Sequence, residues 1–126
     1  MNRESPKRPH EGLAAWQKAM TLVEHVYACS ARYPDEERYG LTAQLRRAAV
    51  SIPSNIAEGA ARRSTPEFLR FLSIARGSLA ELDTQLQIAI RLGYHPPPEA
   101  LHACIDDVFA LLTGLIHSLS ARKATR

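Results

Sequence analysis

The chain of 126 residues carries a net charge of +3, and 45% of its residues are hydrophobic, which are the proportions of one ordinary globular domain. This composition excludes disorder as the main state, and because no uninterrupted apolar run approaches about 18 residues, we expect no membrane span. The polar N-terminus predicts no secretory signal, and the two cysteines, Cys29 and Cys104, are too few for a disulfide scaffold, so we expect a cytoplasmic protein.

Charge is distributed unevenly along the chain. Residues 1–10 sum to +2, residues 41–92 to +3 and residues 93–121 to −3. All seven basic residues within 41–92 are arginines, whose planar guanidinium groups make paired contacts with phosphate or carboxylate. This bias indicates an anionic partner; the alternative is a solvated surface with ordinary ion pairs.

Four stretches rich in proline and glycine divide the chain: residues 6–12, 34–40, 59–66 and 93–98. Between them, apolar residues recur three or four positions apart, which predicts four helices and no strand. The stripes are Leu13, Trp16, Met20, Val23, Tyr27 and Ser30; Leu41, Leu45, Ala48, Ile52 and Ile56; Phe68, Leu72, Ala75, Leu79, Leu82, Leu86 and Ala89; and Leu101, Ile105, Val108, Leu112, Leu115 and Leu119. We expect an all-α, antiparallel up-and-down four-helix bundle over residues 12–121, with flexible basic tails at 1–11 and 122–126.

Pro53 lies inside the second apolar pattern. A proline there removes a helical hydrogen bond and clashes with the carbonyl four residues earlier. We expect a kinked helix, or two helical pieces that meet near residues 51–54. The serine and asparagine side chains around Pro53 are available to satisfy the freed backbone groups.

The third predicted helix has clear start and stop signals. Ser64, Pro66 and Glu67 form a capping box with proline in the first turn. Gly93 then provides a residue suited to the position just after the helix. We therefore expect this helix to begin directly after Ser64 and to end just before Gly93.

The third and fourth predicted helices are apolar over more than one stripe. The additional positions are Leu69, Phe71, Ile74, Ile88, Ile90, Cys104, Leu111 and Ile116. A helix that is apolar over a wide arc is either deeply buried or contacts a second partner. Because a four-helix bundle has one central seam, the extra apolar surface predicts self-association.

A long and unusual run, YGLTAQLRRAAVSIPSNIAEG, occupies residues 39–59, with further distinctive segments at 16–20, 67–72, 75–82 and 85–89. Over about residues 13–94, the chain resembles the small bacterial four-helix-bundle proteins encoded within intervening sequences of 23S ribosomal RNA genes. The resemblance implies an up-and-down bundle that assembles as a ring, a homopentamer. It also implies a relationship to the accessory proteins of diversity-generating retroelements, which form pentameric barrels and bind nucleic acid alongside a reverse transcriptase.

Two polar stripes run through these apolar helices. They consist of Gln44, Ser51, Asn55 and Glu58 on the second helix and Ser78, Glu81 and Gln85 on the third. One interpretation is a buried hydrogen-bond network that sets helix register and oligomer geometry. The other is a polar site at the centre of the bundle or ring, where Glu58 and Glu81 would form a carboxylate pair. A metal site in a bundle typically uses Glu-x-x-His repeats, which this sequence lacks.

The arginines are the stronger candidates for function. They are Arg46, Arg47, Arg62, Arg63, Arg70 and Arg76. Repeated around a ring, they would form a basic belt that contacts phosphates without reading sequence. The alternative is intramolecular pairing, for example of Arg70 with Glu67 or of Arg47 or Arg62 with Glu58. Most of the eight aromatic residues fall at core spacing, which does not favour base stacking.

The histidines and cysteines do not predict a metal or cofactor site. His25 and Cys29 are four residues apart and His102 and Cys104 two apart, and neither spacing is typical of zinc ligands. No glycine-rich phosphate loop is present. We therefore predict a non-enzymatic, homo-oligomeric bundle that binds structured RNA, DNA or a nucleic-acid–protein complex. The alternatives are a scaffold that binds a partner protein, and a small enzyme that uses Glu58 or Glu81.

Overall fold

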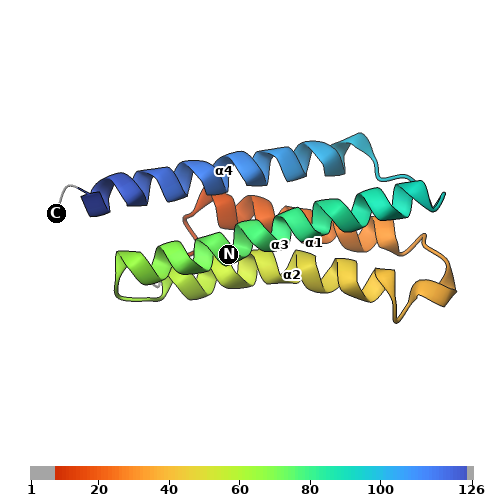
Figure 1. Ribbon diagram of the computed structural model, residues 1–126, viewed down its shortest axis with the longest axis horizontal. Helices are drawn as coiled ribbons and strands as arrows, with labels where there is room; N and C mark the ends of the chain where they lie inside the picture. The colour runs from red at the N-terminus through yellow and green to blue at the C-terminus, as the bar shows by residue number, and fades with distance from the viewer. Residues whose placement is uncertain (1–7, 125–126) are drawn as a thin grey trace, which may run out of the picture.

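The computed structural model describes residues 8–124 and consists of helices joined by short connections. The helices are α1 (Ala14–Ser30), the short 3-10 helix η1 (Asp35–Glu37), α2 (Leu41–Ala60), α3 (Thr65–Arg91) and α4 (Glu99–Ala124) (Figure 1). Since the described residues contain four α-helices and no strand, the predicted all-α, four-helix fold is confirmed. Helix α4 continues beyond residue 121, the predicted end of the bundle. Most of the predicted N-terminal tail and the end of the C-terminal tail lie outside the described residues.

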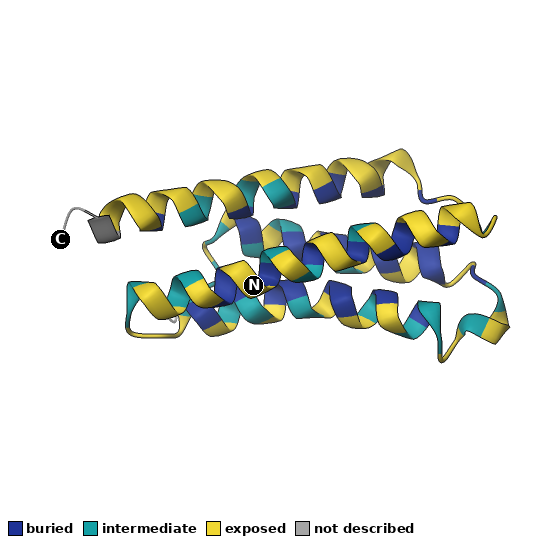
Figure 2. Cartoon of the chain, viewed as in Figure 1, coloured by how far each residue is buried: buried dark blue, intermediate teal, exposed yellow. Residues whose placement is uncertain are grey.

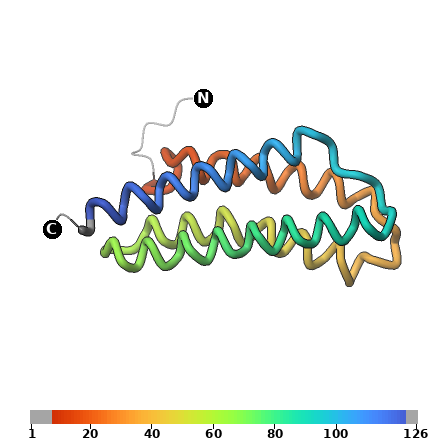
Figure 3. Tube along the Cα trace, turned by 45° about the horizontal axis from the view of Figure 1, so that its top comes forward, coloured from red at the N-terminus to blue at the C-terminus, as the bar shows by residue number. Residues whose placement is uncertain are grey.

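Each long helix packs against two others. Helix α1 contacts α2 and α4, and α3 contacts the same two helices. Successive helices run back and forth along the long axis of the molecule in Figure 1, and Figure 3 shows α1 beside α4 and α2 beside α3. The contact between α2 and α3 is the most extensive of the four.

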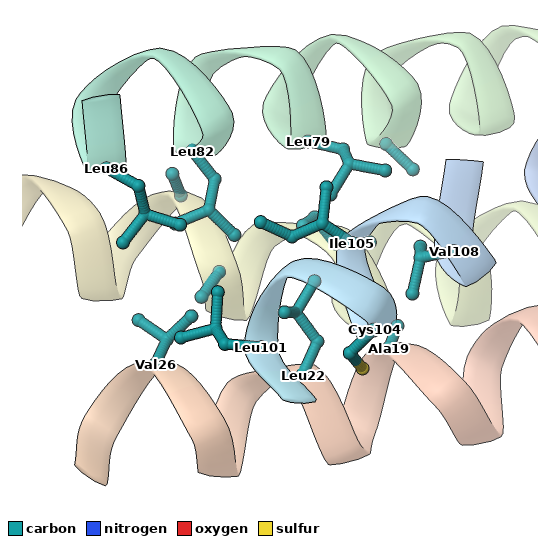
Figure 4. Close-up of a cluster of buried hydrophobic side chains, with 14 of the residues drawn as sticks. Ala19, Leu22, Val26, Leu79, Leu82, Leu86, Leu101, Cys104, Ile105 and Val108 are labelled. Carbon is teal, nitrogen blue, oxygen red and sulfur yellow. The ribbon is translucent and has the colours of Figure 1, made fainter. Parts of the chain in front are cut away.

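The core lies between these helices. Leu79, Leu82 and Leu86 of α3 face Leu22 of α1 and Leu101 of α4 in Figure 4, and all five are at most 1% exposed. The stripes predicted for α2, α3 and α4 are confirmed as core-facing. Their partly buried members are Leu41, Phe68 and Leu115.

The stripe predicted for α1 is confirmed only in part. Ser30 is buried, and Leu13, Trp16 and Val23 are partly buried against the core, but the buried face of this helix comprises Ala15, Ala19, Leu22, Val26, Cys29 and Ser30. The predicted Met20 and Tyr27 are 44% and 42% exposed. Neighbouring stripes on a helix are offset by one residue, and the buried face has the small residues Ala15 and Ala19 where the predicted stripe has Trp16 and Met20. Helix α1 therefore has a second apolar stripe, of which Met20 and Tyr27 are exposed while Trp16 and Val23 are partly buried against the core. Figure 2 shows buried and exposed positions on each long helix, most clearly on α4, whose exposed positions lie on its outer side.

Helix α2 continues through Pro53 as one helix, so the alternative of two separate pieces is wrong. The Ser54 hydroxyl donates to the Val50 carbonyl at 2.7 Å, and the Asn55 amide donates to the Ser51 carbonyl at 2.8 Å. These carbonyls neighbour that of Ala49, which loses its usual partner because proline has no N–H. The kink stays a prediction.

The start and stop signals of α3 are confirmed. Ser64 accepts a hydrogen bond from the Glu67 N–H at 3.3 Å. At the other end, Gly93 has φ of +79°, its N–H bonds to the Ile90 carbonyl, and the Tyr94 N–H bonds to the Ala89 carbonyl. This is a Schellman motif, which glycine favours because a side chain is strained at positive φ.

One carboxylate joins three segments at the end of the bundle that holds this motif. Glu37 of η1 accepts a hydrogen bond from the Leu41 N–H at 3.0 Å, and its other oxygen accepts one from the Tyr94 hydroxyl at 2.6 Å. The Tyr94 bond and then the Leu41 bond lower the pKa of the Glu37 carboxyl. Glu37 thus caps the start of α2 and ties it to the connection between α3 and α4.

This arrangement predicts a loss of stability in acid. A carboxylate whose pKa is lowered by folding contributes stability that is complete above its unfolded pKa, about 4.3 for glutamate, and is lost as the pH falls through the folded value. We expect thermal unfolding by circular dichroism between about pH 7 and pH 3 to show a smaller acid-induced fall in Tm for Tyr94→Phe than for the wild type. Parallel curves would contradict a role for this hydrogen bond.

The tight approach of α2 to α3 predicts opposite effects at two helical glycines. A Cβ at Gly59 would lie 2.7 Å from Cβ of Phe71 and 3.3 Å from the Phe68 carbonyl, whereas one at Gly77 would meet nothing within 4 Å. In urea denaturation, we expect Gly59→Ala to lower the free energy of unfolding by about 1–2 kcal/mol. Gly77→Ala should raise it by about 0.5–1 kcal/mol. Equal stabilisation by both substitutions would refute the close contact.

Candidate functional site

The candidate arginines form two groups rather than one belt within a chain. Arg46 and Arg47 lie in the first half of α2, whereas Arg62 and Arg63 follow its end, beside Arg70 at the start of α3. The sixteen residues from Arg46 to Arg62 correspond to roughly 24 Å along a helix axis. The two groups therefore occupy opposite ends of the α2–α3 pair.

Arg46 is fixed against the end of α1. Its Nε donates to the Ser30 hydroxyl at 2.8 Å and its Nη2 to the Tyr27 carbonyl at 3.3 Å. Its guanidinium carbon lies 4.5 Å from the centre of the Tyr27 ring. The positive charge at the C-terminal end of a helix is also favourable for the helix dipole. Arg46 therefore joins α1 to α2 and is held in one position.

Beside Arg46, the surface between α1 and α2 contains a hollow of about 420 Å³, which we call the arginine hollow. Its lining residues are Tyr27, Arg38, Thr42, Ala43, Arg46, Arg47 and Val50. The lining contains three arginines and no acidic residue, so the hollow is suited to an anion. The nearest carboxylate in sequence, Glu37, is already engaged by Leu41 and Tyr94.

Of the seven lining residues, the sequence predicted only Arg46 and Arg47 as site residues. Tyr27 and Arg38 are the two unpredicted residues that matter most for binding an anion. Tyr27 was assigned to the core because the α1 stripe was placed one face away from the true one. Arg38 lies in a connection, where helical periodicity gives no information. The adjacent pair Arg38-Tyr39 was the available signal, since proteins that bind single strands combine basic side chains with aromatic rings on which bases stack.

The second group of arginines is partly engaged within the chain. Arg62 forms an ion pair with Glu58 at 2.9 Å, and the guanidinium carbons of Arg62 and Arg70 lie 4.8 and 4.9 Å from the centre of the Phe71 ring. The predicted pairing of Arg62 with Glu58 is thus confirmed. The alternative pairing of Arg70 with Glu67 is wrong, because Glu67 contacts the Ser64 hydroxyl instead.

The two remaining arginines differ in exposure. Arg63 is exposed, whereas Arg76 is half-buried along α3. Neither forms an ion pair with an acidic residue in the described part of the chain.

The predicted polar network is smaller than expected. Ser51 and Ser78 share a hydrogen bond at 2.9 Å between α2 and α3, and Asn55 donates to the Ser51 hydroxyl at 2.9 Å. Of the other members, Gln44, Glu58 and Glu81 are exposed in the single chain. Gln85 is 7% exposed, and its side-chain oxygen lacks a hydrogen-bond partner. The Ser51–Ser78 bond links α2 to α3, whereas the Asn55 bond lies within α2.

Glu58 and Glu81 do not form a carboxylate pair. Ser51 of α2 faces Ser78 of α3; Glu58 lies seven residues from Ser51 and Glu81 three residues from Ser78 in the opposite direction along the axis. About ten helical positions, or roughly 15 Å, separate the two carboxylates. That distance is too great for a shared proton or a shared metal ion.

The thiols are also unsuited to catalysis. Cys29 and Cys104 are buried, and burial raises the pKa of both, which is the opposite of what an activated nucleophile requires. Within residues 8–122, no group of three or more metal-ligating side chains comes together.

A second surface feature is apolar and lies between α1 and α2 on the side of Pro53. This groove of about 360 Å³ is lined by Trp16, Met20, Val23, Val50, Pro53, Ser54 and Ala57. On α3, Ile74, Ile88 and Ile90 are each more than 40% exposed. Exposed apolar surface of this kind marks contact sites.

Helix α4 bears on the expectation that no segment of the chain spans a membrane. Among the described residues, Glu99–Arg122 is the one stretch long and apolar enough to span a membrane by length and composition, and 28% of its most apolar part is buried. That expectation was based on uninterrupted apolar runs, and Asp106 and Asp107 interrupt the apolar residues of α4. Asp107 forms an ion pair with Lys18 of α1 at 3.4 Å.

Comparison with known proteins bears on this fold and surface. A search of curated proteins gave no match. The family model described as 23S rRNA-intervening sequence protein matches residues 11–114, which is well over half of the chain. The matched region contains α1, α2, α3 and most of α4. Together with the four-helix fold, this match shows that the chain belongs to the 23S rRNA-intervening sequence protein family.

Proposed function

We propose that this protein is a non-enzymatic, homo-oligomeric helical bundle of the cytoplasm that binds nucleic acid, chiefly RNA, through its arginines. The observation that carries the proposal is the arginine hollow, where Arg38, Arg46 and Arg47 meet without a carboxylate in the lining. A concave surface of one charge concentrates ligands of the opposite charge. Phosphate groups are among the anions that an arginine side chain binds through two parallel hydrogen bonds.

The arginines at the other end of α2 extend this basic surface. Arg63, Arg70 and Arg76 form no ion pair with a described acidic residue, and Arg62 shares its charge with Glu58. Contacts from such side chains to phosphates do not depend on base sequence, and they weaken as salt rises.

The apolar surfaces support self-association. The groove between α1 and α2 and the exposed isoleucines of α3 lie on different helices. Contact between two different faces of neighbouring copies is a heterologous interface, which produces a closed ring when the rotation closes. We propose the antiparallel bundle as the repeating unit and the homopentamer as the ring, as the family resemblance implies.

The apolar groove also supports a second candidate, a scaffold that binds a partner protein. In that case the arginines would pair with acidic side chains of the partner, and affinity would depend chiefly on apolar burial. A protein complex of this kind responds weakly to salt, which separates it from the first candidate.

The nucleic-acid proposal predicts salt-sensitive binding. We expect fluorescence anisotropy to show log affinity falling linearly with log salt, with a slope of about −0.7 for each phosphate contact on single-stranded RNA. The double variant Arg47→Glu/Arg63→Glu should weaken binding at least about tenfold. Arg32→Glu/Arg91→Glu makes the same change in charge at exposed positions elsewhere and serves as the control. An intact oligomer that binds no RNA or DNA near 50 mM salt would refute the proposal.

The proposed assembly predicts that charges in the apolar groove dissolve the oligomer. Met20 and Val50 are more than 40% exposed in the single chain, so Met20→Glu/Val50→Glu should keep its helical circular dichroism. Light scattering after gel filtration should show the mass falling toward that of one chain. Thr21→Glu, at an exposed position outside the groove, should leave the mass unchanged. An unchanged mass in the groove variant would show that this groove is not the interface.

A further inference from the structure

The arginine hollow contains one guanidinium that is already positioned to receive a ligand. Arg46 uses its Nε donor and one Nη2 donor on Ser30 and Tyr27. A guanidinium has five N–H donors, so three remain for a ligand. Arg46 is held by these bonds and by the Tyr27 ring. The binding of a ligand to Arg46 therefore costs little side-chain conformational entropy.

The number of cations in the hollow favours one kind of phosphate. Arg38 comes from the connection before α2 and Arg47 from α2 itself, and neither forms an ion pair with a described residue. A phosphodiester inside a strand has one negative charge and two free oxygens. A phosphate monoester has a charge of about −1.5 to −2 and three acceptor oxygens, which match three guanidinium groups better.

Acidic residues limit how a strand can continue from this hollow. Helix η1, with Asp35, Glu36 and Glu37, directly precedes Arg38. Backbone phosphates that continued toward η1 would be repelled by these carboxylates, whereas the phosphate at the end of a strand has no neighbour on that side.

An exposed aromatic ring, that of Tyr39, lies beside Arg38. Tyr39 is 86% exposed, more than any other large hydrophobic side chain among the described residues. The Arg38 guanidinium carbon lies 5.0 Å from the centre of its ring. Aromatic rings on protein surfaces stack unpaired bases. The volume of the hollow, about 420 Å³, is within the range of small-ligand sites, roughly 300–1,000 Å³.

We infer that the arginine hollow binds the terminal phosphate monoester of an RNA strand, with Arg38, Arg46 and Arg47 on the phosphate and Tyr39 stacked on the terminal base. The inference rests on the proposed function and specifies where and what the protein binds. It distinguishes this hollow from Arg63 and Arg70, which contact internal phosphates at the other end of α2.

The test compares three single-stranded RNAs of one sequence, with a 5′-phosphate, a 3′-phosphate or only hydroxyl ends. We expect one phosphorylated RNA to bind at least about tenfold more tightly than the hydroxyl form; which one identifies the end that is recognised. Arg38→Ala and Arg47→Ala should bring this ratio close to one. Arg32→Ala, which removes an exposed arginine outside the hollow, should leave the ratio unchanged. Arg46 is not substituted because it also holds α1.

Two further measurements separate recognition of the end from general attraction. Arg63→Ala should weaken binding of all three RNAs alike. Tyr39→Phe should keep the preference for the phosphorylated end, whereas Tyr39→Ala should reduce it. A nucleoside monophosphate should raise the Tm of the wild type more than inorganic phosphate does, and this shift should be lost in Arg38→Ala.

Two results would separate terminal-phosphate recognition from general RNA binding. Equal, salt-sensitive binding of the three RNAs would overturn the inference and leave the proposed function standing. Failure of all three to bind an intact oligomer would overturn both.

Discussion

The close contact of α2 with α3 is the constraint on which the other elements depend. Gly59 leaves room for Phe71 and Phe68 at one end of the seam, and Ser51 bonds Ser78 near its middle. Small residues let the two helix axes approach, and interior packing then leaves little freedom in the rotation of either helix. The faces that remain on α2 and α3 are where α1 and α4 must pack.

The rotation of α1 decides the character of the surface. Its small residues Ala15 and Ala19 share the buried face with Leu22 and Val26, so Met20 and Tyr27 remain exposed on the side next to α2. Near Pro53 this produces the apolar groove. One helical turn further toward the end of α1, the same face places Tyr27 against Arg46 and forms one wall of the arginine hollow. The rotation of α1 about its axis thus produces both the apolar groove and the arginine hollow.

The arginines also divide by what surrounds them. Arg46 contributes to the fold because it bonds the end of α1, and Arg62 is partly neutralised by Glu58. Arg38 and Arg47 form no ion pair with a described residue, and both line the hollow with a guanidinium that is already fixed. A surface with one fixed cation and two cations that have no acidic partner is suited to an anion with several acceptor oxygens, which a count of arginines along the chain does not reveal.

The sequence by itself determined the four helices, the cap at Ser64, the stop at Gly93 and the core faces of α2, α3 and α4. These features follow from local propensity and from stripes of large apolar residues, and both can be recognised from residues that lie close together in the sequence. Only the tertiary structure decided the face of α1 that is buried, the separation of Glu58 from Glu81 and the meeting of Arg38, Arg46 and Tyr27. The physical reason is that small side chains carry little hydrophobic signal yet control how closely helices approach, and that contacts between separate elements depend on that approach.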